Sequence, residues 1–146
     1  MEGREEGEIK ILLVEDTEDD ILIVERALKK GMLRSRLFVA RDGEEALDFL
    51  YNRGDYADEK RYPKPDIILL DLRLPKLDGI DVLKRIRSDE KLKDIPVVVF
   101  TSSDRDVDII KTYEDGVRGY IVKSAFIQKT VKMEGLLDAI ISFIRR

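Results

Sequence analysis

The chain has 146 residues, a formal net charge of −4, 40% charged side chains, and neither cysteine nor histidine. The lack of cysteine excludes disulfides and thiolate metal sites, and the lack of histidine excludes imidazole catalysis. The negative charge argues against wrapping nucleic acid, and no apolar stretch reaches the roughly 20 residues of a membrane span. We therefore expect a cytoplasmic domain that contacts neither nucleic acid nor a membrane directly.

Short apolar runs alternate along the chain with segments of helical periodicity. The expected strands are residues 10–14, 36–40, 66–70, 96–100 and 119–122. The expected helices are residues 19–30, 43–51, 79–87, 105–114 and 130–144. This strict alternation predicts an α/β fold, with a doubly wound five-stranded parallel sheet flanked by five helices. Residues 1–8 are polar and predict a flexible leader, which leaves one domain over 9–146.

Residues typical of helix caps and of loops support these boundaries. Asp42 and Asp78 stand directly before expected helices, where an aspartate side chain can cap the first turn. Residues 52–65 contain two prolines, one glycine and many charges, which predicts a long surface loop.

Chemically reactive side chains follow four of the apolar runs. They are Glu15, Asp16, Asp71, Thr101 and Lys123. Runs this short, apolar and β-branched suit strands that are buried on both faces of a parallel sheet. Ligands of open α/β sheets bind beyond the carboxyl ends of the strands. We therefore expect three carboxylates, one hydroxyl and one ammonium to meet at one edge.

The acidic pair after the first strand replaces the glycines of a nucleotide-binding turn. Glu15 and Asp16 would repel free phosphate and attract a hard cation. The alternative is a helix N-terminus whose acids favour the macrodipole, and Asp19 and Asp20 fit that alternative better.

Asp71 follows four consecutive large aliphatic residues, where a charge must be paired or bound to metal. Together with Asp16 it predicts an Mg²⁺ site made of oxygen ligands. A carboxylate beside such a cation can act as a nucleophile and form an acyl phosphate. Taken alone, Asp71 would also suit a cap on the next turn.

Thr101 supplies a hydroxyl that suits a phosphate on Asp71, and Lys123 supplies a point charge that suits either Asp71 itself or phosphate oxygens. Each is commonplace at the end of a strand and, taken alone, is better explained structurally. Their joint placement, 30 and 52 residues after Asp71, favours a shared site.

Four motifs together resemble the receiver domain of two-component response regulators. They read ILLVEDTEDD, DIILLDLRLPKLDGIDVLKRIR, VVVFTSSD and GYIVKS, and the resemblance runs in order from Lys10 to Arg146. It implies the flavodoxin-like (CheY-like) strand order 2-1-3-4-5. The long loop over 52–65 is similar to that of single-domain regulators partnered with phytochrome-type and other sensor kinases.

The resemblance also implies a role for each site residue. Asp71 would be the phosphoacceptor, with Thr101 and Lys123 as its phosphate contacts. Thr101 would pair with Tyr120 as the conformational switch. The implied Mg²⁺ ligands are Glu15, Asp16, Asp71 and the backbone carbonyl of Arg73.

Two positions depart from the family pattern. Ser124 stands where the family has a proline joined by a cis peptide, so the loop after Lys123 is expected to have its own shape. Arg73 places a long cation beside the phosphoacceptor, which puts the lifetime of an acyl phosphate in question.

The function implied is phosphorylation-controlled signalling. A sensor histidine kinase or a histidine phosphotransfer protein would donate the phosphoryl group, and the phosphorylated chain would contact a downstream protein that the sequence does not identify. Since the sequence ends at Arg146, we expect no attached output domain. We expect no enzyme activity beyond self-catalysed phosphotransfer and dephosphorylation.

Two other classes of protein would use the same residues. An aspartate-nucleophile phosphohydrolase would need a general acid two positions after Asp71, where Arg73 cannot serve. A degenerate receiver would act only as a binding module, and the presence of every site residue argues against it.

The last expected helix has a wide apolar face, made of Leu136, Leu137, Ile140, Ile141 and Ile144. We expect part of this face to form a homodimer together with the 105–114 helix and the fifth strand. The alternative is an ordinary core helix.

Overall fold

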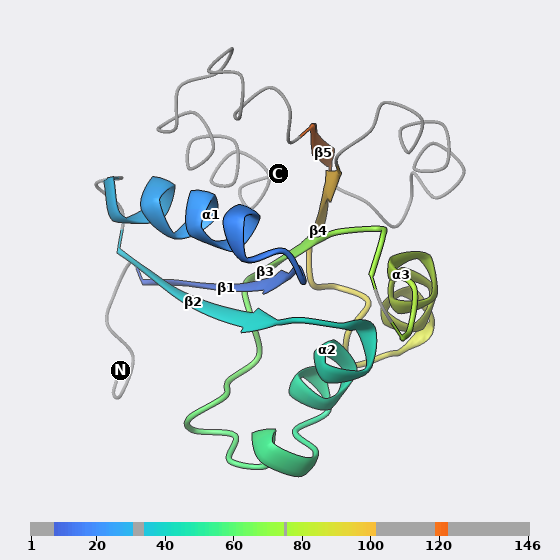
Figure 1. The fold of residues 1–146 in the computed structure, drawn as a ribbon. Helices are drawn as coiled ribbons and strands as arrows, with labels where there is room; N and C mark the ends of the chain where they lie inside the picture. Colours follow the sequence, from blue (N-terminus) through green and yellow to red (C-terminus); the bar gives the residue numbers. More distant parts are fainter. Residues whose placement is uncertain (1–7, 31–33, 75, 102–118, 123–146) are drawn as a thin grey trace.

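The computed structural model describes residues 8–30, 34–74, 76–101 and 119–122. Its strands form one parallel sheet in the order β2-β1-β3-β4-β5, as the resemblance implied (Figure 1). Their bounds are Ile9–Val14 for β1, Ser35–Ala40 for β2, Ile67–Leu70 for β3, Val97–Thr101 for β4 and Gly119–Val122 for β5. Each differs from its predicted start by no more than one residue.

Three of the five expected helices lie within the described residues. They are α1 over Glu18–Lys30, α2 over Gly43–Leu50 and α3 over Gly79–Ser88. In Figure 1, α1 covers one face of the sheet, and α2 and α3 lie toward the other. The helices expected over 105–114 and 130–144, with the dimer face they would build, lie outside the described residues and stay predictions.

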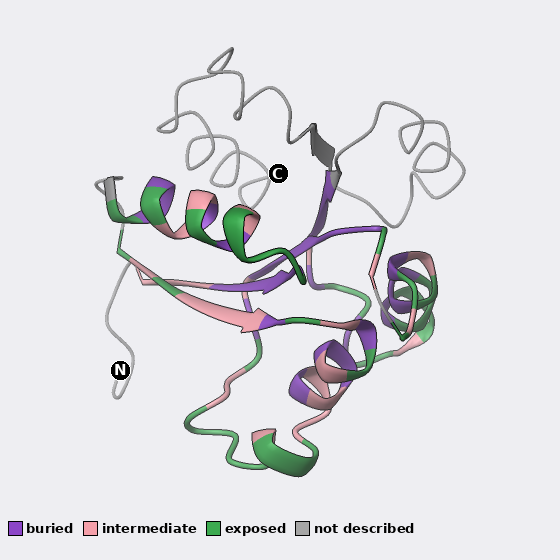
Figure 2. Cartoon of the chain, in the orientation of Figure 1, coloured by how far each residue is buried: buried purple, intermediate pink, exposed green. Residues whose placement is uncertain are grey.

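The buried residues divide into two groups, one on each face of the sheet. On β1, Ile11 and Leu13 pack with α1, whereas Leu12 and Val14 pack with α2 and α3. All four are fully buried, which explains why the strand reads as a continuous apolar run instead of an alternating one. In Figure 2, the buried residues lie on the inner strands and on the inward sides of the helices, whereas most of β2, at the edge of the sheet, is of intermediate exposure.

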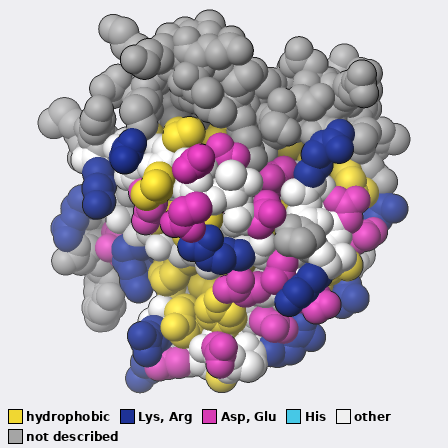
Figure 3. Space-filling view, viewed as in Figure 1, with side chains coloured by type: hydrophobic (Ala, Val, Ile, Leu, Met, Phe, Trp, Pro, Cys, Tyr) yellow, Lys and Arg dark blue, Asp and Glu magenta, His cyan; other side chains and the backbone are white. Residues whose placement is uncertain are grey.

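The segment over 52–65 has more internal structure than the predicted surface loop. It contains the 3₁₀ turn η1, Gly54–Tyr56, and the Asn52 side-chain amide donates to the carbonyls of Tyr56 and Tyr62 at 2.9 and 3.0 Å. These two tyrosines join an aromatic cluster, which consists of Phe38, Phe49, Tyr56 and Tyr62. Hydrophobic side chains are visible in this part of the surface in Figure 3, among charges of both signs.

The two predicted helix caps have different outcomes. Asp42 is the N-cap of α2, and its Oδ1 accepts the Glu45 N–H at 2.8 Å. Asp78 holds the N-cap position of α3, but its side chain makes no capping hydrogen bond, so this part of the prediction is wrong. No helix in the described residues is long and apolar enough to cross a membrane.

Candidate metal centre

Three carboxylates meet at the carboxyl edge of the sheet. Glu15 and Asp16 follow β1, and Asp71 follows β3, whose last residue Leu70 is paired in register with Val14 of β1. One oxygen from each carboxylate lies within 4.8 Å of the others. The convergence expected from the strand ends is therefore present for these three residues.

Burial differs sharply among the three carboxylates. The side chains of Glu15 and Asp71 are buried, with 0% and 5% of each residue exposed, whereas Asp16 lies on the surface. Burying two acids this close together is costly unless a cation or hydrogen bonds compensate. Among the described residues, Asp16 therefore marks the solvent-facing side of the arrangement.

Backbone hydrogen bonds hold both buried acids in place. The Asp71 N–H donates to the Val14 carbonyl at 3.0 Å, and Asp71 Oδ1 accepts the Arg73 N–H at 2.9 Å. The Glu15 N–H donates to the carbonyl of Ala40, at the end of β2, at 2.9 Å. Three neighbouring strand ends therefore fix the centre.

The donor set consists only of carboxylate oxygens, which suits a hard divalent cation such as Mg²⁺. A bound cation would also relieve the mutual repulsion of the three acids. The residues present therefore fit the metal that the sequence predicts.

For the other predicted site residues, the structure describes at most the backbone. Thr101 ends β4 and is paired in register with Val122, the last residue of β5, which also contains Tyr120. The side chains of Thr101 and Tyr120, together with Lys123 and its peptide bond to Ser124, lie outside the described residues. Their approach to Asp71 stays a prediction.

Two glycines that the sequence analysis did not single out fix the segment after Asp71. A Cβ on Gly79 would collide with the Asp71 carbonyl oxygen and lie 2.5 Å from Leu72 Cα. A Cβ on Gly43 would collide with the Leu77 carbonyl oxygen. The starts of α2 and α3 therefore pack directly on the backbone that follows Asp71, and only glycine permits that approach. Each glycine follows an aspartate at a predicted helix start, which was the available signal.

Ion pairs add further links around the centre. Arg41, just after β2, pairs with Glu18 at the start of α1 at 2.8 Å. Lys76, which has a left-handed φ of 61°, pairs with Asp42 at 3.5 Å. Both side chains of the Arg41–Glu18 pair are exposed, so this pair contributes little on its own. In the second pair Lys76 is exposed, whereas the Asp42 side chain is mostly covered.

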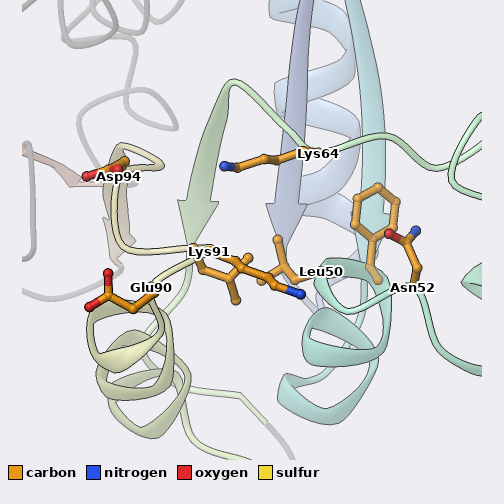
Figure 4. A pocket seen from close by; sticks show the side chains of 8 residues that line it. Leu50, Asn52, Lys64, Glu90, Lys91 and Asp94 are labelled. Carbon is orange, nitrogen blue, oxygen red and sulfur yellow. The ribbon is translucent and has the colours of Figure 1, made fainter.

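A separate pocket of about 410 Å³ lies at the opposite end of the sheet, beside the starts of β3 and β4. Its wall consists of Phe49, Leu50, Asn52, Lys64, Glu90, Lys91, Leu92 and Asp94. Figure 4 shows the ammonium groups of Lys64 and Lys91 pointing in different directions. The two lysines are balanced by two acids, so the wall has no net charge that would select an ion.

Comparison with known proteins agrees with this geometry. A family model described as the response regulator receiver domain matches residues 11–140. The chain belongs to the response regulator receiver family. It is 43% identical over 123 residues to the response regulator Rcp1 of Synechocystis sp., which covers 84% of this chain and 82% of Rcp1. It is 37% identical over 128 residues to the chemotaxis protein CheY-3 of Vibrio cholerae, covering 85% of this receiver and 86% of CheY-3.

Solved structures give the same result. The phosphorylated cyanobacterial phytochrome response regulator RcpA has a TM-score of 0.77 and 42% identity, and the match covers 88% of this chain and 91% of that one. The Mn²⁺-bound form of Rcp1 has a TM-score of 0.76 and 40% identity, with the same two coverages, 88% and 91%. The chain is therefore a response regulator receiver with the flavodoxin-like fold, as the motifs implied.

Proposed function

We propose that Asp71 accepts a phosphoryl group in a reaction that depends on Mg²⁺ held by Glu15, Asp16, Asp71 and the Arg73 carbonyl. One observation carries the proposal: the carboxylates of Glu15, Asp16 and Asp71 lie within 4.8 Å of one another at the strand ends. The Arg73 N–H already holds one Asp71 oxygen, which aligns the carboxylate. The receiver domain would span 9–146 and follow a leader over 1–8.

In the transfer step, an Asp71 carboxylate oxygen attacks phosphorus and the bond from phosphorus to the donor nitrogen breaks. The nitrogen keeps the electron pair and takes up a proton. Bound Mg²⁺ would offset the negative charge gathered by the carboxylates and the phosphoryl oxygens. Water attack at phosphorus later releases inorganic phosphate and regenerates Asp71. Thr101 and Lys123 would contact the phosphoryl oxygens, and Thr101 with Tyr120 would pass the change to the surface.

The donor would be a phosphohistidine on a sensor histidine kinase or a histidine phosphotransfer protein, because this chain has no histidine of its own. The relatives Rcp1, RcpA and CheY-3 support a place in two-component signalling. Output would pass through contacts with a downstream protein in the cytoplasm. The chain would catalyse only its own phosphorylation and dephosphorylation.

Intact-mass measurement after incubation with phosphoramidate and Mg²⁺ tests the proposal. The wild type should gain one phosphoryl group, and Asp71→Asn should gain none. Asp78→Asn is the matched control, because Asp78 is an exposed aspartate on the same segment whose side chain makes no capping bond. Label retained in Asp71→Asn would overturn the assignment.

Two further outcomes separate the other classes of protein. Sustained turnover of an aryl phosphate in a steady-state assay would favour an aspartate-nucleophile phosphohydrolase. A wild type that takes up no phosphoryl group from either phosphoramidate or acetyl phosphate would favour a degenerate receiver.

A further inference from the structure

The peptide unit between Ala40 and Arg41 is held at both of its polar atoms. Its carbonyl accepts the Glu15 N–H at 2.9 Å, and its N–H donates to Glu45 Oε1 at 2.8 Å. Glu15 belongs to the metal centre, whereas Glu45 lies in the first turn of α2. One peptide plane therefore connects the metal centre to a carboxylate outside it.

The second oxygen of that outer carboxylate also has a partner. Glu45 Oε2 accepts a hydrogen bond from the hydroxyl of Tyr56, which belongs to η1 in the 52–65 segment. Desolvation and the Glu45 carboxylate both raise the pKa of Tyr56, which favours the protonated hydroxyl that donates this hydrogen bond. The full chain of hydrogen bonds runs from Tyr56 through Glu45 and the 40–41 peptide to the Glu15 backbone.

The ring of Tyr56 is fixed by its neighbours. Its centroid lies 5.3 Å from that of Phe49 and 4.9 Å from that of Tyr62, and the Asn52 amide holds the backbone carbonyls of both tyrosines. The hydroxyl therefore has a defined position, set by the fold of the 52–65 segment.

We propose that Glu45 and Tyr56 are positioning residues of the metal centre, and that the 52–65 segment sets its Mg²⁺ affinity through them. The inference rests on the proposed function, because it assigns a regulation to the same site. Hydrogen bonds in a chain polarise one another, and a charged acceptor in the middle strengthens both neighbours. Outer partners of metal ligands are known to tune affinity by orienting those ligands.

The sharpest variant is Tyr56→Phe, which removes one hydroxyl and keeps the ring in the aromatic cluster. Tyr62→Phe is the matched control, because the Tyr62 hydroxyl has no hydrogen-bond partner among the described residues and its ring contacts the same cluster. Mg²⁺ dissociation constants come from NMR titrations that follow backbone amides. We expect Tyr56→Phe to weaken Mg²⁺ binding about two- to fivefold, less than for a direct partner of a ligand. Tyr62→Phe should bind as the wild type does.

A spectroscopic readout separates positioning from loss of stability. The amide signals of Glu15 and Arg41 should shift in metal-free Tyr56→Phe and stay in place in Tyr62→Phe, since only the first variant disturbs the chain of hydrogen bonds. Unchanged Mg²⁺ affinity in Tyr56→Phe would overturn the inference, and so would a weakened affinity with unchanged Glu15 and Arg41 signals.

A double-mutant cycle tests whether Tyr56 affects Mg²⁺ affinity through Glu45. Glu45→Gln keeps an acceptor for the Arg41 N–H but loses the charge that the Tyr56 hydroxyl contacts. In that background, Tyr56→Phe should have less effect on Mg²⁺ affinity than in the wild type. Fully additive effects would show that Tyr56 acts by another route and would overturn the inference.

The proposed function is checked on the same samples. If the wild type takes no phosphoryl group from phosphoramidate, the proposed function fails. If the wild type is phosphorylated but Tyr56→Phe and Tyr62→Phe share one Mg²⁺ affinity, only the further inference fails.

Discussion

The Tyr51 hydroxyl donates to Asp89 Oδ2 at 2.5 Å, and this hydrogen bond ties the end of α2 to the turn after α3. The Tyr51 hydroxyl and the Lys91 N–H both lower the pKa of Asp89. The same contact raises the pKa of Tyr51, with Asp89 as the main cause. Two helices on one face of the sheet thus share a bond that depends on the charge of one carboxylate.

Acid should weaken that bond. Because the pKa of Asp89 is lower in the folded chain than in the unfolded chain, its stabilisation is complete above the unfolded value of about 3.9 and is lost as the pH falls through the folded value. Urea unfolding of the wild type and Tyr51→Phe at several pH values measures the difference. The free energies of unfolding should differ at pH 6 and converge toward pH 2. A difference that stays constant over this range would contradict the assignment.

Tyr56 should lose its stabilising effect at high pH, whereas Asp89 loses its effect at low pH. Burial and the Glu45 carboxylate raise the pKa of Tyr56 above its unfolded value of about 10. Its stabilisation is therefore complete below pH 10 and is lost as the pH rises toward the folded value. The free energy of unfolding should fall more steeply above pH 10 in the wild type than in Tyr56→Phe. Parallel curves for the two proteins would be the contrary result.

Substitution of the acidic pair should rank the metal ligands. We expect Asp16→Ala to weaken Mg²⁺ binding more than Glu15→Ala, because the resemblance aligns the direct ligand of the family with Asp16. Asp19→Ala serves as the control, since Asp19 is an exposed acid in the first turn of α1, shortly after the acidic pair. Asp19→Ala should leave the Mg²⁺ affinity near the wild-type value. Equal losses for Asp16→Ala and Glu15→Ala in a metal titration would refute the ranking.

Two glycines should respond differently to alanine. Gly79→Ala places a methyl group against the Asp71 carbonyl and the Leu72 backbone, and overpacking of this kind costs about 2 kcal/mol of stability. It should also slow phosphorylation, because the displaced backbone follows Asp71 directly. Gly54 has a left-handed φ of +57° with open space around its Cβ position, so Gly54→Ala should cost only about 1 kcal/mol of strain. Denaturation and intact-mass kinetics of both variants test this contrast.

The centre was predictable where it depends on strand topology. Glu15, Asp16 and Asp71 each follow an apolar run, and parallel pairing brings such run ends to one edge whatever the side-chain detail. The Glu45–Tyr56 hydrogen bond was not predictable, because it depends on how η1 folds a segment that reads only as a polar loop. The missing capping bond of Asp78 was not predictable either. Its sequence position is that of a cap, but the cap also requires a side-chain orientation that the pattern does not encode.

Asp71 and Glu15 are buried beside an exposed Asp16, and this asymmetry restricts the direction from which a phosphorus atom can arrive. Within the described part of the chain, the open side of the three acids is the one that carries Asp16. A phosphoryl donor that comes from this side therefore passes the exposed Asp16 before its phosphorus atom reaches the buried Asp71 carboxylate.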